Sequence, residues 1–272
     1  MTVEYLKKAP LHSRSDAGET RDIVGKILDE IEAGGDEKAL EYAAKFDNYQ
    51  GAILLSAEAI KTASALVPDK MKRDIEFAHA NVKKFAEAQK STVADFETEV
   101  VPGLIAGQKA IPVNAAGCYI PGGRYSHVAS AIMTVTTAKV AGCKNIIACS
   151  PPRPDIGVAP AIIYAAHISG ADKILAMGGV QGLAAMTFGL FGLPKANILV
   201  GPGNQFIAEA KRPGDEIDIK KLPPELQKRW TQHGGARDKE WKKINVEGAT
   251  RVWRGEAARQ LAKQYADRII RS

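Results

Sequence analysis

Between residues 114 and 212, short apolar runs with the character of strands alternate with helix-like segments. Four runs have the length of buried strands: 115–120, 145–149, 173–177 and 197–200. Three helix-like segments lie between them: 128–141, 159–169 and 183–191. Strands and helices that alternate through short connections form a parallel sheet covered by helices. The pattern therefore predicts a Rossmann-like α/β domain over residues 112–212.

The rest of the chain shows different patterns on the two sides of this domain. Residues 1–111 contain several helix-like segments and, at 95–112, apolar residues around a Pro-Gly pair that predict two paired strands. We interpret this part as an N-terminal helical and α/β portion. Helix predictions within it cover 16–33, 37–46, 56–66 and 69–90. After Arg212 the alternation ends, and residues 213–272 are predicted to form a short, irregular and partly helical C-terminal tail.

Composition and charge narrow the class of protein. No apolar run approaches the roughly 20 residues needed to span a membrane, and residues 1–14 lack the apolar segment of a secretory signal. The three cysteines cannot all pair in disulfides and show no C-x-x-C spacing, which favours a reduced, cytoplasmic environment. The net charge is −4 over residues 1–111, +5 over 112–212 and +5 over 213–272. The basic middle suits the phosphates of a dinucleotide, whereas the mixed charges of the tail argue against nucleic acid as a partner.

Four bends rich in glycine or proline follow the four strand-like runs. They lie at residues 119–123, 150–152, 178–181 and 201–204. In a parallel α/β sheet such bends share the carboxyl edge of the strands, where ligands bind. The sequence therefore predicts one site of nucleotide size at this edge.

Five residues in these bends are the candidates for binding a dinucleotide. Gly203 and Asn204 precede a short helix whose first amides favour an anion, and Asn204 has an amide for a ribose or a phosphate. Gly179 lets the backbone approach a ligand closely, and Gln181 supplies a donor and an acceptor. Tyr119 supplies a flat apolar face and a hydroxyl. The alternative interpretation is structural, with tight turns that join strand to helix and a tyrosine that belongs to the core.

Four further side chains carry chemistry near these bends. His127 lies at the start of a predicted helix, where the pattern fits a general base and fits a capping or surface histidine at least as well. Arg124 is suited to an anionic group or to solvent exposure. Cys149 ends a strand and is expected to be a buried, inert thiol. His167 lies among apolar helix residues and is expected to pack in the core.

Taken together, the bends at 119–123, 178–181 and 201–204, with the motif at 138–142 and the residues 210–212, resemble the histidinol dehydrogenase family. The segment from Gly35 to Asp47 is similar to the N-terminal pattern of that family, and the resemblance covers about residues 16–212. It implies oxidation of a small alcohol through an aldehyde to an acid, with NAD as oxidant and a zinc ion that holds the substrate. It also implies a homodimer, with sites completed by the partner chain, and NAD contacts from Tyr119, Gln181 and Asn204.

Two departures from the family pattern affect the expected function. Residues 123–127 look more like the branch that oxidises small diols such as dihydroxypropanesulfonate, so the substrate is either L-histidinol or a sulfonated diol. The zinc ligands and the Glu-His pair of the family have no counterpart that we can place, and the sequence contains no Glu-His dipeptide. We therefore expect an internal deletion after Arg212. The alternative function is a catalytically inactive homologue that only binds dinucleotide or pairs with an intact subunit.

Overall fold

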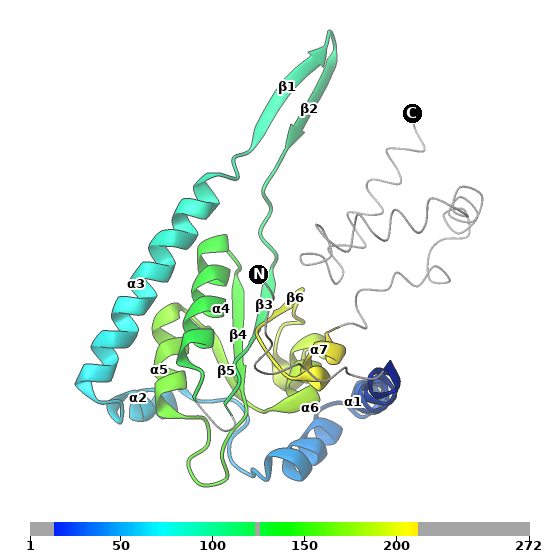
Figure 1. Cartoon of the computed structure of the whole chain (residues 1–272), viewed down its shortest axis with the longest axis vertical. Helices are drawn as coiled ribbons and strands as arrows, with labels where there is room; N and C mark the ends of the chain where they lie inside the picture. Colours follow the sequence, from blue (N-terminus) through cyan, green and yellow to red (C-terminus); the bar gives the residue numbers. More distant parts are fainter. Residues whose placement is uncertain (1–13, 123–125, 212–272) are drawn as a thin grey trace, which may run out of the picture.

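The computed structural model describes residues 14–122 and 126–211, and a parallel sheet of four strands lies at its centre (Figure 1). The strands are β3 (Ala115–Tyr119), β4 (Asn145–Ser150), β5 (Lys173–Ala176) and β6 (Ile198–Val200), in the order β5-β4-β3-β6. All five residues of β3 are buried, as expected for a strand covered on both faces. The predicted α/β fold with a Rossmann-like parallel sheet is confirmed.

Helices connect the strands close to the positions that the sequence predicts. They are α4 (Val128–Ala141), α5 (Pro160–Ser169), α6 (Gly179–Phe188) and α7 (Gln205–Ala210), with a 3₁₀ turn at Leu190–Gly192. Gly142 and Gly170 end α4 and α5 with φ of 94° and 100°, a conformation that favours glycine. These two glycines therefore end their helices.

Helix α6 differs from its prediction because it begins at Gly179 instead of at residue 183. Gly178 is its extended N-cap, so Val180 and Gln181 belong to the first turn of the helix and not to a bend. Both are buried, together with the next five residues of the helix. The helix starts early because this nearly continuous apolar surface packs between the sheet and α1.

Helices cover both faces of the sheet and create two hydrophobic cores (Figure 1). On one face, α1 (Arg14–Asp47), α6 and α7 pack over side chains such as Ile147 and Leu175. On the other face, α4 and α5 pack over Ile146 and Ile174, and α2 (Ala57–Ala65) and α3 (Asp69–Ser91) pack against these two helices. None of the helices in the described part of the chain combines the length and the apolar character needed to cross a membrane.

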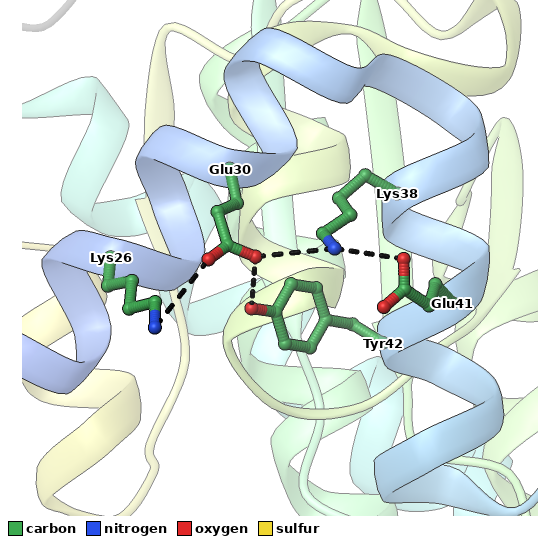
Figure 2. A network of polar contacts seen from close by, with 5 residues as sticks. All are labelled: Lys26, Glu30, Lys38, Glu41 and Tyr42. Atoms are coloured by element: carbon green, nitrogen blue, oxygen red, sulfur yellow. Dashed lines mark hydrogen bonds and ion pairs between the residues drawn. The ribbon is translucent and has the colours of Figure 1, made fainter.

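Helix α1 consists of two halves that meet at Gly35, where φ is 59° and ψ is −142°. The glycine produces the break that the sequence predicts between two helices. Polar side chains from both halves form a network across the break (Figure 2). Its contacts join Lys26 to Glu30 at 3.9 Å, Lys38 to Glu30 at 3.4 Å, Lys38 to Glu41 at 2.9 Å and the Tyr42 hydroxyl to Glu30 at 2.8 Å. The network thus links the two halves across the break, and the second half ends at Asp47.

The segment after α1 returns the chain to the sheet. Leu54 forms a single antiparallel bridge with Leu175 of β5. Ser56 then caps α2 by accepting a hydrogen bond from the Ala59 backbone amide at 3.1 Å. The apolar side chains of α3 are only partly buried: Ile75 lies in the core, whereas Phe85 is 66% exposed.

A hairpin projects away from the sheet beyond the end of α3 (Figure 1). Its antiparallel strands are β1 (Phe96–Val101) and β2 (Leu104–Gln108), and every residue in both strands is exposed. The hairpin and its Pro-Gly turn are therefore as predicted. Four apolar side chains beside the turn are more than half exposed: Val100, Val101, Leu104 and Ile105.

Candidate dinucleotide-binding site

The bends after β3, β4, β5 and β6 meet at the carboxyl edge of the sheet. A Cβ atom on Gly122 would lie 3.0 Å from the Pro151 carbonyl oxygen, and one on Gly178 would lie 2.7 Å from the Pro151 Cβ. A Cβ atom on Gly201 would lie 2.0 Å from the Tyr119 carbonyl oxygen. Each bend therefore touches its neighbour with no room for a side chain, and the predicted convergence on one edge is confirmed.

The strand order sets where a ligand crevice would lie at this edge. The chain runs outward from β3 through β4 to β5, and then β6 returns to the opposite side of β3. Ligands of open α/β sheets bind where the strand order reverses in this way. Here that point lies between the bend at Tyr119 and the bend at Gly201, which has φ of 126°.

Tyr119 supports the crevice from within the core. Its side chain is buried, at 5% exposure, and its hydroxyl accepts a hydrogen bond from the Gly179 backbone amide at 3.3 Å. Burial raises the pKa of this hydroxyl above its ordinary value, so it stays protonated near neutral pH. Tyr119 thus joins the end of β3 to the start of α6.

Gln181 is held inside the protein at the first turn of α6. It is 1% exposed, and its Nε2 group donates a hydrogen bond to Oδ2 of Asp47 at 3.1 Å. Its Oε1 atom lies only 2.6 Å from the position that a Cβ on Gly179 would take. Gly179, with φ of 55°, is therefore required both by its backbone and by the side chain of Gln181.

Asp47 is the residue that sequence reasoning missed at this edge. It ends α1, far from the bends in the sequence, and Oδ2 accepts a second hydrogen bond from the Gly178 backbone amide at 2.9 Å. Burial raises the pKa of Asp47, although its two hydrogen bonds act in the opposite direction. The sequence marks Asp47 only as the end of a motif, because nothing local indicates that α1 crosses to the bends.

Asn204 and Gly203 lie on the other side of the crevice. Asn204 is the N-cap of α7, and its Oδ1 atom accepts a hydrogen bond from the Ile207 backbone amide at 3.1 Å. Both residues are exposed, and a Cβ on Gly203 would lie 2.3 Å from Cγ2 of Ile207. The Lys211 ammonium group donates a hydrogen bond to the Gly201 carbonyl oxygen and ties the end of α7 to the bend.

The other candidate side chains have clearly different surroundings. Cys149 is fully buried, its thiol donates to the Met177 carbonyl oxygen at 3.0 Å, and burial raises its pKa well above the ordinary value. The expectation of a buried thiol is thus confirmed. His127 is exposed just before α4, whereas Arg124 lies outside the described residues. His167 is exposed on α5, so the expectation that it packs in the core is wrong; its position falls on the outer side of the helix.

The residues present suit a dinucleotide better than a metal. Asn204 is exposed at this edge and its amide suits a ribose or a phosphate, whereas protein atoms fill the space beside the glycines of the bends. Within residues 14–122 and 126–211, no group of three or more His, Cys, Asp and Glu side chains is arranged to hold a metal ion. The zinc ion implied by the sequence resemblance therefore has no assigned ligands in this part of the chain.

Replacement of Asp47 by asparagine is expected to leave the protein at least as stable near neutral pH. Because burial raises the pKa of Asp47, the folded state holds this proton more tightly than the unfolded chain. The protonated Asp47 carboxyl therefore stabilises the folded protein fully below the ordinary pKa of aspartate. This stabilisation is lost as the pH rises through the raised pKa of Asp47. Thermal unfolding between about pH 4 and about pH 7 should show a Tm advantage of Asp47→Asn that grows with pH. An advantage that shrinks as the pH rises would contradict the burial of this charge.

Comparison with known proteins identifies the family. The sequence profile described as histidinol dehydrogenase matches residues 11–221. The chain belongs to the histidinol dehydrogenase family. The resemblance inferred from the bends is thereby confirmed.

Individual members of the histidinol dehydrogenase family match across the same region. A sulfopropanediol 3-dehydrogenase from Ruegeria pomeroyi is 72% identical over 212 residues, which are 78% of this chain and 49% of that protein. A histidinol dehydrogenase from Methanosarcina barkeri is 39% identical over 207 residues, or 75% of this chain and 48% of the relative. The chain thus spans about half the length of these relatives.

A solved structure from the family supports the same assignment. The crystal structure of histidinol dehydrogenase from Elizabethkingia anophelis aligns with a TM-score of 0.66 and 32% sequence identity. The alignment covers 74% of this chain and 49% of the other. The fold of the described region is therefore that of one half of a histidinol dehydrogenase.

Proposed function

We propose that this chain binds NAD at the carboxyl edge of its sheet, as part of an oxidoreductase that converts a small alcohol through the aldehyde to the acid. The convergence of four bends on the crevice between β3 and β6 is the observation that carries this proposal. Membership of the histidinol dehydrogenase family supports the alcohol as substrate class. NAD, when bound, supplies the acceptor for the hydride that leaves the alcohol carbon.

The residues of this chain have two roles in the proposed binding. Asn204 and Gly203 lie at the exposed rim and would contact the dinucleotide directly, with the Asn204 amide toward a ribose or a phosphate. Tyr119, Gln181 and Gly179 fix the bends from within, through the hydrogen bonds to the Gly179 amide and to Asp47. A direct contact from Tyr119 or Gln181 requires their buried side chains to become accessible when NAD binds.

For the substrate, we propose a sulfonated diol in preference to L-histidinol. The relative that is 72% identical is a sulfopropanediol 3-dehydrogenase, whereas the histidinol dehydrogenase from Methanosarcina barkeri is 39% identical. Arg124 would suit a sulfonate chemically, because a guanidinium group pairs with oxyanions through two parallel hydrogen bonds. Its placement lies outside the described residues.

The second candidate function is NAD binding without catalysis, by a homologue that acts alone or pairs with an intact subunit. The observation in its favour is that the 272-residue sequence contains no Glu-His dipeptide, the pair that the family resemblance assigns to proton transfer. Both candidates share the dinucleotide site and differ only in turnover.

The binding site is tested by calorimetry with NAD on the wild-type chain and on Asn204→Ala. We expect the variant to bind NAD about tenfold more weakly, because one ligand hydrogen bond and the cap of α7 are lost together. Ser56→Ala is a matched control, since it removes the same kind of cap from α2 at a distance from the crevice. If Asn204→Ala and Ser56→Ala bind NAD with equal affinity, the assigned rim is wrong.

Turnover separates the two candidate functions. NADH formation from sulfopropanediol and from L-histidinol is followed by absorbance in the presence of zinc. Oxidation of the diol in preference to histidinol would support the dehydrogenase proposal. NAD binding without NADH formation from either alcohol would support the second candidate.

We propose further that the protein is a cytoplasmic homodimer. The three cysteines are buried and unpaired, which suits a reducing compartment. The four exposed apolar side chains beside the hairpin turn offer a contact surface for a second chain, since a two-stranded hairpin is marginally stable alone. The measurement is the mass in solution by light scattering.

A further inference from the structure

The adenosine side of the proposed NAD site lacks the acidic residue expected from strand β4. In dinucleotide-binding sheets of this strand order, an Asp or Glu near the end of the strand beside the central one binds the ribose 2′-hydroxyl. Here β3 is the central strand and β4 its neighbour on the outward side. The residues that follow β4 are Pro151 and Pro152, and the first acid, Asp155, is exposed in the turn between Arg153 and Gly157.

A carboxylate from α1 lies beside this strand end instead. The Oδ1 atom of Asp47 and the Cβ atom of Pro151 lie 2.5 Å and 2.7 Å from the point that a Cβ on Gly178 would occupy. Asp47 is therefore placed between the ends of β4 and β5. The absence of a side chain at Gly178 is what lets the carboxylate enter.

The hydrogen bonds of Asp47 leave one oxygen available. Oδ2 accepts from the Gly178 amide and from the Gln181 Nε2 group, which fixes the orientation of the carboxylate. Within residues 14–122 and 126–211, Oδ1 accepts no hydrogen bond and no cation pairs with the carboxylate. Asp47 is half-buried, so Oδ1 is an oriented acceptor on a side chain that keeps part of its surface exposed.

We propose that Asp47 accepts the adenosine ribose hydroxyls of the dinucleotide and makes the site select NAD over NADP. This inference rests on the proposed function. An oriented carboxylate oxygen accepts hydrogen bonds from a ribose diol and repels the 2′-phosphate of NADP. Partial burial strengthens both effects, because charges interact more strongly at lower dielectric. The acid that the sheet lacks is thus supplied by the N-terminal portion of the chain.

The test measures the Kd of NAD and of NADP by calorimetry on the full chain, for the wild type, Asp47→Asn, Asp47→Ser and Asp155→Asn. We expect the wild type to prefer NAD. Both neutral variants at Asp47 should bind NAD about tenfold more weakly and lose at least about tenfold of the preference over NADP. Asp155→Asn makes the same chemical change on the same edge and should leave the preference unchanged. Thermal unfolding of each variant confirms that it is folded.

The outcomes separate this inference from the function on which it rests. A wild-type chain that binds neither dinucleotide overturns the proposed function and this inference together. NAD binding with an unchanged preference in both folded Asp47 variants overturns the inference and leaves the function standing. A loss of preference in Asp155→Asn instead would assign the ribose to the turn after β4 and would also overturn it.

Discussion

Gly201→Ala is expected to destabilise the protein by about 3 kcal/mol or more. The new Cβ atom would lie 2.0 Å from the Tyr119 carbonyl oxygen, so β3 and the bend after β6 would have to separate. Gly201 also has φ of 126°, which an alanine adopts only with strain. Urea unfolding followed by circular dichroism measures the loss, and NAD binding should weaken at the same time because the crevice opens.

A matched glycine elsewhere separates this effect from a general effect of alanine. Gly25 lies within α1, and a Cβ atom there would meet nothing within 4 Å. Gly25→Ala should therefore stabilise the protein by about 0.5–1 kcal/mol, through helix propensity alone. Equal unfolding midpoints for Gly201→Ala and the wild type would show that the bend does not approach Tyr119 as described.

Ile147→Ala is expected to cost about 2–5 kcal/mol of folding free energy. Ile147 lies in the middle of β4, is 1% exposed, and packs in the core formed by the sheet with α1 and α6. Removing three carbon atoms there leaves a cavity that surrounding strands and helices fill only in part. The free energy of unfolding from urea denaturation gives the cost.

A smaller truncation of the same side chain calibrates the expected loss of folding free energy. Ile147→Val removes one carbon atom and should cost about 0.5–1.5 kcal/mol. Because the core of Ile147 includes α1, Ile147→Ala should also speed hydrogen exchange at the buried positions of that helix, such as Val24 and Ile31. Faster hydrogen exchange in the strands of the sheet with unchanged exchange in α1 would contradict a core shared by the sheet and α1.

The secondary structure was predictable where local signals agree with burial. The strand-like runs match β3, β4, β5 and β6, and α4 has the bounds that its apolar spacing indicates. The ends of α4 and α5 follow from local sequence, because each depends on the left-handed backbone conformation that a single glycine favours. The start of α6 was missed because Gly179 is a poor helix former, and its place in the helix depends on packing.

The meeting of the four bends at one edge was predictable, but the contacts around them were not. Parallel strands bring their following bends to one edge, so four bends in order were enough to locate it. The use of Tyr119 and Gln181 as internal supports was not predictable, because it depends on burial by α1. Asp47, the hydrogen-bond partner of Gln181, lies 134 positions earlier in the sequence, and no local pattern links the two residues.

The sequence by itself determined the α/β order, the glycine bends and membership of the family, because these follow from local periodicity and from motifs. Only the tertiary structure decided that α1 packs on the face of α6 and carries Asp47 to the ends of β4 and β5. That placement results from hydrophobic burial between distant segments, a non-directional force that no short stretch of sequence encodes. The polar contacts at the crevice follow from it, since each one joins groups that the packing has already brought together.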